Sequence, residues 1–380
     1  MKVKLMTTAA VAATALLAAA CGSSTTSAGT SASPPAAVAS PSSPAAGSTA
    51  SAAGKFLGCM VTDTGGIDDR SFNSSSWQGM QQAATAQPGK ISVTYLQSSS
   101  SSDYAPNISQ FITKKCGIIV TVGFLMGTNT QTAAKASPAQ KFAIVDYTYS
   151  PALKNVDALV FNTAQDGFLG GYLAAGMSKT GKVATFGGLQ LPTVTIYMDG
   201  YWDGVQYYNS RHHANVQVLG WNEKTQKGVF SGGFTNQGAG QTITQTFISE
   251  GADVIFPVAG NVGLGAAKAV SNADAQAGSN KINMEWVDTD GCISAAQYCK
   301  YFITSVTKGI QAAVKAAVLG AAGGTFTGGN YVGTLANNGV VLSPYHNFAS
   351  KVPAALQAEL AKIKAQIISG SIKPATKSPA

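Results

Sequence analysis

The sequence predicts an α/β fold with two doubly wound lobes. From Lys55 onward, short apolar runs rich in β-branched residues alternate with amphipathic stretches. This pattern is typical of parallel strands connected by helices that cover both faces of a sheet. The runs form two series along the chain. About 325 residues follow residue 54, which is more than one compact core usually holds, so we expect each series to form its own lobe.

The first series contains five predicted strands, each a short apolar run. They are Phe56–Thr62, Ile91–Leu96, Gly117–Val122, Phe142–Val145 and Ala158–Phe161. Helices are predicted at Asn73–Ala86 and Asn107–Lys114. The first of these places Trp77, Met80 and Ala84 on one face at helical spacing, with Asn73 or Ser74 as its N-cap.

The second series repeats the alternation. Its predicted strands are Lys182–Phe186, Val216–Gly220, Asp253–Val258 and Ile282–Val287. Its predicted helices are Gln165–Lys179, Val194–Ser210, Gln241–Glu250, Gly263–Asn272, Thr307–Ala322 and Val352–Ser369. Pro192 and Pro353 lie where two of these helices begin, a position that proline favours.

Residues 1–54 are predicted to lie outside the lobes. Residues 1–20 carry Lys2 and Lys4 before an Ala/Leu/Val run, which is typical of a secretory signal. The Leu-Leu-Ala-Ala-Ala run before Cys21 is similar to a bacterial lipobox, in which the cysteine is lipidated; cleavage of an ordinary signal peptide nearby is the alternative. Residues 21–54 contain no charged or aromatic residue, so we expect a disordered tether that holds the lobes off a membrane.

Composition argues against several functional classes. The net charge of +8 is modest for 380 residues, and no Lys/Arg run with interleaved aromatics is present, so nucleic-acid binding is not expected. No stretch after residue 20 is apolar for long enough to span a bilayer. The sequence has only three His and no serine nucleophile with a partner histidine in a motif, so hydrolase chemistry is not expected.

Four cysteines remain after Cys21, an even number in a chain expected to be exported. Cys59 lies in the first predicted strand and Cys116 just before the third, so the two could bridge neighbouring strands. Cys292 and Cys299 could close a small loop. A zinc site is not expected, because it needs four ligands at tight spacing. The adjacent His212-His213 pair would point in different directions and His346 stands alone, so solvated histidines are expected.

Polar and glycine residues recur where predicted strands end. In an open α/β sheet, ligands bind beyond the carboxyl ends of the strands. The residues at these ends are Asp63, Gly123 and Asp146 in the first series and Gly187-Gly188, Gly260 and Asp288 in the second. After Asp63 the chain turns through two glycines, passes Asp68-Asp69 and enters a helix. Backbone N–H groups there could hold ligand atoms, or the carboxylates could simply cap the helix. The glycines from Gly260 to Gly265 likewise suit either a polar ligand or tight packing.

Seven stretches of the chain form an ordered set of motifs. They are Asp63-x-Gly65-Gly66-x-Asp68-Asp69-x-Ser71-Phe72-Asn73, Gly123-Phe124, Phe168-Leu169-x-Gly171-Tyr172-Leu173-Ala174-Ala175, Gly187-Gly188-x-x-x-Pro192-x-Val194, Gly251-Ala252-Asp253-Val254-Ile255-Phe256-Pro257-Val258-Ala259-Gly260, Val287-Asp288-x-Asp290 and Thr304-Ser305-Val306-x-Lys308. In this order they resemble the basic membrane protein family of substrate-binding lipoproteins, which includes the purine nucleoside receptor lipoproteins. The resemblance spans roughly residues 56–345.

The resemblance implies a type I periplasmic-binding-protein architecture. Two Rossmann-like lobes would be joined by three crossings and close on a ligand by hinge motion. We expect lobe 1 to comprise residues 55–162 and about 291–325, and lobe 2 residues 163–290 and about 326–370, with 371–380 as a tail. The family implies a lipid-anchored receptor on the outer face of the cell membrane. Its partners would be the permease and ATPase subunits of an ABC importer. We expect a binding protein rather than an enzyme, and no cofactor.

The resemblance also implies a nucleoside site. Asn73 and Asp146 would contact the base, Asn73 with both a donor and an acceptor, while Asp288 and Lys308 would hold the ribose. Phe234 would stack on the base, and Phe124, Trp77 or Trp202 could supply a second ring. Asp63, Asp69, Gly123 and Gly260 complete the predicted cleft. A sugar or vitamin ligand, or a sensor that signals to a membrane receptor, remain alternatives.

Overall fold

The computed structural model describes residues 55–278 and 281–378. The predicted signal peptide, the Cys21 lipidation site and the tether lie outside these residues. Residues 54–380 group into one compact unit with its own hydrophobic cores, so they are used alone in the experiments below. Among the helices that the structure describes, none combines the length and apolar character needed to cross a membrane.

The first lobe is built on a parallel six-stranded sheet in the order β13-β5-β4-β3-β1-β2. Its strands are β1 (Phe56–Val61), β2 (Ile91–Leu96), β3 (Ile118–Val122), β4 (Phe142–Val145), β5 (Val156–Phe161) and β13 (Gly329–Gly333). Its helices are α1 (Phe72–Ala86), α2 (Tyr104–Thr113), α3 (Gly127–Ala136) and α9 (Ile310–Ala322). Met60 packs in the core with α1 and α9, whereas Cys59 and Val61 pack with α2 and α3. Helices therefore cover both faces, as the apolar strands require.

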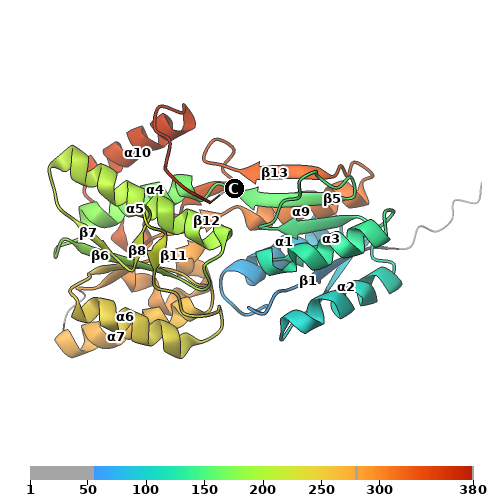
Figure 1. Ribbon diagram of the computed structural model, residues 1–380, viewed down its shortest axis with the longest axis horizontal. Helices are drawn as coiled ribbons and strands as arrows, with labels where there is room; N and C mark the ends of the chain where they lie inside the picture. Colours follow the sequence, from blue (N-terminus) through green and yellow to red (C-terminus); the bar gives the residue numbers. More distant parts are fainter. Residues whose placement is uncertain (1–54, 279–280, 379–380) are drawn as a thin grey trace, which may run out of the picture. The chain divides into compact units, whose positions relative to one another are not determined.

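The second lobe contains a sheet of matching order, β14-β12-β11-β10-β6-β7. Its strands are β6 (Lys182–Gly187), β7 (Gln217–Leu219), β10 (Val254–Val258), β11 (Asn283–Asp288), β12 (Phe302–Lys308) and the antiparallel β14 (Val340–Leu342). Its helices are α4 (Ala164–Met177), α5 (Pro192–His212), α6 (Gln237–Ser249), α7 (Val262–Ala277), α8 (Gly291–Ser294) and α10 (Ala354–Ile368). Figure 1 shows α6 and α7 on one face of this sheet and α4 and α5 on the other. A short hairpin, β8 (Trp221–Asn222) and β9 (Lys227–Gly228), lies outside both sheets.

Helices α4 and α5 pack at backbone distance. A Cβ added to Gly171 would lie 1.9 Å from the carbonyl oxygen of Tyr201, and one added to Gly204 would lie 2.0 Å from that of Phe168. Such distances leave no space for a methyl group. These glycines therefore allow α5, whose first turn reaches the cleft, to lie close against α4.

The chain crosses between the lobes three times, at residues 162–163, at Gly309 and at residues 334–339. The crossings bond to one another, because the amide of Gly309 donates to the carbonyl of Gly339 at 2.8 Å. The amide of Asn162 likewise donates to the carbonyl of Gly333 at 2.8 Å. Three crossings and two sheets are the expected two-lobed architecture.

The lobe boundaries differ from our expectation. Strand β12 belongs to the second sheet, so of the elements within residues 291–325 only helix α9 joins lobe 1. Strand β13, which we expected in lobe 2, belongs to the first sheet. The predicted helix Thr307–Ala322 is wrong at its start, because residues 307–308 end β12. The expected tail is fixed to α5 over residues 375–378, where Thr376 donates to Asp199 at 2.8 Å.

Both cysteine pairings are confirmed. Cys59 of β1 is bonded to Cys116, with a Cα–Cα distance of 6.0 Å, and Cys292 to Cys299, with 4.5 Å. The three histidines are exposed, as predicted, but His212 also has partners, since its Nε2 lies 3.1 Å from Glu359 Oε2 and 3.0 Å from the hydroxyl of Tyr172. It thereby connects α5 to α10 and α4.

Candidate ligand-binding site

A cavity of about 570 Å³, including its open mouth, lies where strands of both sheets end. All the side chains and glycines that we predicted for the cleft line it: Asp63, Asp69, Asn73, Gly123, Asp146, Phe234, Gly260, Asp288 and Lys308. The two sheets therefore bring together residues that are up to 245 positions apart, from Asp63 to Lys308.

Asp69 fixes the start of α1. Its carboxylate accepts backbone N–H bonds from Ser71 at 3.0 Å, Asn73 at 2.7 Å and Ser74 at 3.0 Å. Burial raises the pKa of Asp69, and these hydrogen bonds oppose the shift. For Asp69 the helix-capping interpretation therefore accounts for the carboxylate.

Asn73 has no N–H left for a ligand. Its Nδ2 donates to Asp63 Oδ1 at 2.8 Å and to Asp69 Oδ2 at 3.1 Å. Two carboxylate acceptors on one side fix the orientation of the amide, because its oxygen would be repelled there. Its Oδ1 is buried and has no partner among the described residues. The expectation that Asn73 offers both a donor and an acceptor is therefore wrong: only the acceptor is free.

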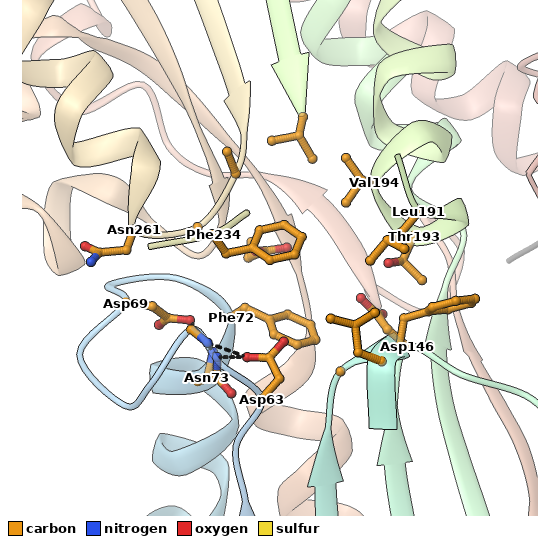
Figure 2. A pocket seen from close by; sticks show the side chains of 18 of the residues that line it. Asp63, Asp69, Phe72, Asn73, Asp146, Leu191, Thr193, Val194, Phe234 and Asn261 are labelled. Carbon is orange, nitrogen blue, oxygen red and sulfur yellow. Dashed lines mark hydrogen bonds between the residues drawn. The ribbon is translucent and has the colours of Figure 1, made fainter. Parts of the chain in front are cut away.

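Asp63 presents one free oxygen. Its Oδ1 accepts from the amide of Gly65 at 2.9 Å and from Asn73, while no hydrogen bond from a described residue reaches Oδ2. Figure 2 shows the carboxylate between Asn73 and the ring of Phe72. Burial raises the pKa of Asp63 to about 6, although the bonds from Asn73 and Gly65 lower it. A ligand N–H or O–H at Oδ2 would favour the ionised form.

A buried cation connects the two lobes. Lys308 Nζ, at the end of β12, lies 2.5 Å from Asp146 Oδ2 and 3.7 Å from Asp288 Oδ1. Burial disfavours the Lys308 ammonium, but the attraction of Asp146 and Asp288 outweighs it and raises the pKa of Lys308. Burial also raises the pKa of Asp146, against the opposing effect of Lys308. Asp288 accepts hydrogen bonds from Ser71 Oγ at 2.8 Å and Tyr197 OH at 3.2 Å.

The two lobes present carboxylates in the same way. Asp146 follows β4 and Asp288 ends β11, the third strand in each sheet order. Both residues adopt a left-handed backbone, with φ of 67° and 65°, which costs energy for a residue with a side chain. Gly123 after β3 and Gly260 after β10, again equivalent strands, also have positive φ.

Two phenyl rings face each other across the cavity. Figure 2 shows Phe234 on one side and Phe72 on the other, with Asp63 beside the space between them. Phe72 was not among the rings proposed from the sequence, although it lies in the Ser71-Phe72-Asn73 stretch that begins α1. Phe124 also lines the cavity, whereas Trp77 and Trp202 do not.

Four further cavity residues were not predicted, although Val194 belongs to one of the stretches that carry the resemblance. The first two turns of α5 contribute Thr193, Val194 and Tyr197, and Leu191 precedes the helix. Their place in the sequence could have indicated them, because Gly187 ends β6, Gly188 follows it, and Pro192 starts the next helix. A helix that begins beyond the carboxyl end of a strand points its first turn at the cleft.

The chain resembles known solute receptors over nearly all of its described length. Residues 56–376 match the Bmp family model, described as ABC transporter substrate-binding protein PnrA-like. The chain is 30% identical to the nucleoside-binding protein BmpA of Lactococcus lactis, over 82% of this chain and 87% of that protein. It is also 30% identical to the CD4+ T-cell-stimulating antigen of Listeria monocytogenes, over 84% and 87% of the two chains.

Solved structures share the fold. A solute-binding protein of an ABC transporter system from Aeropyrum pernix matches with a TM-score of 0.76 and 24% identity, over 85% of this chain and 94% of that one. The arabinose-binding protein AraP of Geobacillus stearothermophilus matches with a TM-score of 0.56 and 16% identity, over 79% and 100%. The family match covers the two lobes and the cleft between them, and it identifies the chain as a member of the Bmp family of PnrA-like ABC transporter substrate-binding proteins.

Proposed function

We propose that this protein captures a nucleoside, with purines favoured, for an ABC importer. The observation that carries the proposal is the pair of rings, Phe72 and Phe234, facing each other beside Asp63. A flat heterocycle between two rings gains about 1–3 kcal/mol per stacked base. The nucleoside-binding name of the Lactococcus lactis relative supports the same ligand class.

The polar groups divide between base and sugar. On the first lobe, Asp63 Oδ2 and the carboxylate of Asp146 are acceptors, so they favour a base edge that carries N–H groups. Asn73 holds Asp63 in place through its amide. On the second lobe, Asp288 can accept bonds from ribose hydroxyls, and Lys308 can donate a bond while it balances the carboxylates.

Charge favours a neutral ligand. The cavity lining contains Asp63, Asp69, Asp146 and Asp288 against the single cation of Lys308. A phosphate would meet this net negative surface in a buried space where repulsion is poorly screened. We therefore expect nucleosides to bind and nucleotides to be rejected.

We further propose that the mature protein is anchored through lipidated Cys21 on the outer face of the cell membrane. Residues 22–54 then tether the lobes near permease and ATPase subunits. A Cys21→Ser chain expressed in cells should leave the membrane fraction for the soluble exported fraction. Retention of that variant in the membrane would contradict the anchor.

Calorimetry tests the ligand directly. Residues 55–380 are unfolded, freed of ligand, refolded and titrated with purine and pyrimidine nucleosides, free bases, ribose and nucleoside monophosphates. Phe234→Ala should weaken nucleoside binding about 5- to 160-fold, the equivalent of one lost stacking contact. Asp68→Asn is a control, because Asp68 is exposed in the loop that carries Asp63 and Asp69 and does not line the cavity. A folded protein that gives no heat with any nucleoside would refute the ligand assignment.

A further inference from the structure

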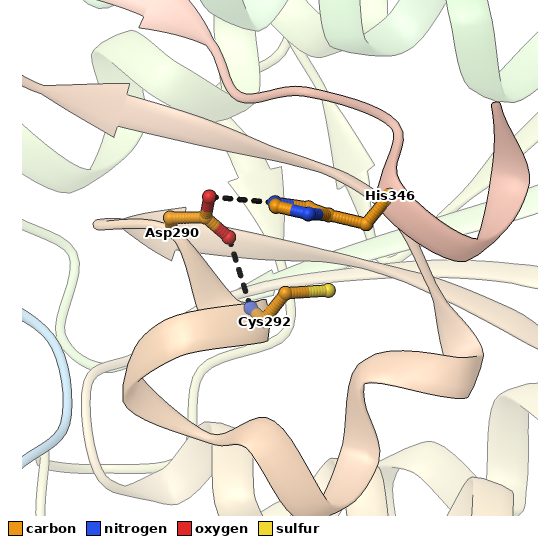
Figure 3. A group of neighbouring side chains, drawn as sticks. All are labelled: Asp290, Cys292 and His346. Atoms are coloured by element: carbon orange, nitrogen blue, oxygen red, sulfur yellow. Dashed lines mark hydrogen bonds and ion pairs between the residues drawn. The ribbon is translucent and has the colours of Figure 1, made fainter.

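A second cluster of chemically active side chains lies outside the ligand cavity. Asp290 Oδ2 lies 2.7 Å from His346 Nε2, and Asp290 Oδ1 accepts the amide hydrogen of Cys292 at 2.9 Å (Figure 3). Donor atoms of Asp290, Cys292 and His346 all lie within 4.8 Å of one another. Cys299 joins them through its disulfide with Cys292. The expectation that His346 stands alone is therefore wrong.

The cluster is held by three separate segments. Asp290 is the N-cap of α8, and the next amide, that of Gly291, donates to Ser305 Oγ of β12 at 3.0 Å. Cys299 lies in the 3₁₀ turn Ala296–Tyr301, and His346 begins the turn His346–Phe348. The second lobe therefore positions these side chains without any contribution from a ligand.

The oxidation state of the cysteines decides what this cluster can bind. While the disulfide is intact, only a carboxylate and an imidazole are available, because the thiolate is the metal ligand. With the disulfide reduced, two thiolates, one imidazole and one carboxylate are present, a donor set that suits four-coordinate zinc. Zinc–ligand bonds of about 2.0–2.3 Å require donors about 3.3–3.8 Å apart. The donor atoms of Asp290, Cys292 and His346, now within 4.8 Å of one another, must approach by about 1 Å, and the His346 side chain, 32% exposed, is free to make this movement. The Cys299 sulfur must instead move away from the Cys292 sulfur once the disulfide is reduced.

We propose that reduction of Cys292–Cys299 by a dithiol creates a Zn²⁺ site formed by Cys292, Cys299, His346 and Asp290. The dithiol gives two electrons and two protons to the cysteine sulfurs and itself becomes a disulfide. Zn²⁺ then displaces the two thiol protons as it binds. Reduction is selective because Cys292 and Cys299 are partly exposed, whereas Cys59 and Cys116 are 0% and 4% exposed.

Residues 55–380 test the proposal, because they lack Cys21 and contain only these four cysteines. The folded protein is reduced with dithiothreitol, desalted without oxygen, and its thiols are counted with a chromogenic disulfide. Zn²⁺ is then titrated in competition with a chromophoric chelator, and Co²⁺ is added to a second sample as a spectroscopic probe. We expect two thiols per chain, one Zn²⁺ per chain, and thiolate-to-cobalt charge-transfer bands.

Variants assign the ligands. Zn²⁺ affinity should fall at least 100-fold in the oxidised protein and in Cys292→Ser, and at least 10-fold in His346→Ala and Asp290→Asn. His213→Ala, which changes an exposed histidine away from the cluster, should bind Zn²⁺ as the parent does. Equal affinity in the oxidised and reduced proteins, or an unchanged affinity in His346→Ala, would overturn the proposal. Nucleoside binding plays no part in these readouts, so failure of the proposed function leaves the test intact.

Discussion

Replacing Lys308 with methionine should destabilise the ligand-free protein by about 3–5 kcal/mol at pH 7, the usual cost of breaking a buried ion pair from one side. The side chains of Lys308 and Asp146 are only 4% and 6% exposed, and their charged atoms lie 2.5 Å apart. Methionine is about as long as lysine and fills the space, so the loss is electrostatic. It leaves Asp146 buried without its cation.

The stability loss in Lys308→Met should depend on pH. Burial already raises the folded-state pKa of Asp146 above 3.8, and loss of Lys308 raises it further. A carboxyl whose pKa is higher in the folded than in the unfolded protein does not reduce stability at a pH low enough to protonate it in both. It reduces the free energy of unfolding increasingly as the pH rises from the unfolded-state pKa to the folded-state pKa. The difference between Lys308→Met and the parent should therefore shrink as the pH falls towards 4.

Urea unfolding of residues 55–380, followed by circular dichroism at several pH values, measures the loss. Lys362→Met, at an exposed position of α10, should change stability by less than about 0.5 kcal/mol. The double variant Lys308→Met/Asp146→Leu should recover most of the loss, because an apolar pair can replace a buried ion pair. A loss below about 1 kcal/mol for Lys308→Met, or one independent of pH, would refute the electrostatic reasoning.

Three further predictions follow from the site and the packing. Asp63→Asn should flatten the pH dependence of stability between pH 4 and 7. The pKa of Asp63 is raised to about 6 in the folded protein, so Asp63 ionises first in the unfolded chain and the parent loses stability as the pH rises through this range. Identical urea midpoints for both proteins across this range would contradict this expectation. Phe72→Ala should weaken nucleoside binding about as much as Phe234→Ala, by calorimetry, and an unchanged Kd would exclude Phe72 from the stack. Gly171→Ala should destabilise the protein by about 1–3 kcal/mol or more, because its methyl would meet the Tyr201 carbonyl at 1.9 Å. Gly320→Ala is the control for glycine replacement within a helix, because its methyl would meet only Thr325 Oγ1, at 3.7 Å.

Most strands and long helices could be predicted from the sequence because short apolar runs alternate with longer helical stretches. Ile91–Leu96 and Phe142–Val145 agree to the residue with β2 and β4. Helix α3 was missed because its residues are mostly Thr, Asn, Gln and Ala, and only Gly127, Thr130 and Ala134 are buried. Strand β13 was missed because it lies at the edge of its sheet and contains two glycines.

The site was predictable where strand ends and motifs coincide, as at Asp63, Gly123, Asp146 and Asp288. The hydrogen-bonding role of Asn73 was not, since it depends on two carboxylates that the turn brings to one amide. The sequence also did not show which lobe β12 joins, because the order of strands in a sheet depends on long-range packing that leaves no local pattern. The proximity of Asp290, Cys292 and His346 has the same cause, since 56 residues separate Asp290 from His346.

The matching left-handed aspartates have a consequence for how a ligand is oriented. Asp146 and Asp288 enter the cleft from equivalent strands of the two sheets, with the same left-handed backbone. Taken alone, the two carboxylates would therefore hardly distinguish one orientation of a ligand from the reverse. Lys308 has no such counterpart: it ends β12, whereas the equivalent strand β5 ends at Phe161. It also lies unequally between the acids, 2.5 Å from Asp146 and 3.7 Å from Asp288. In the proposed binding mode, this single cation would distinguish the two ends of the cavity and so favour one orientation of an asymmetric ligand.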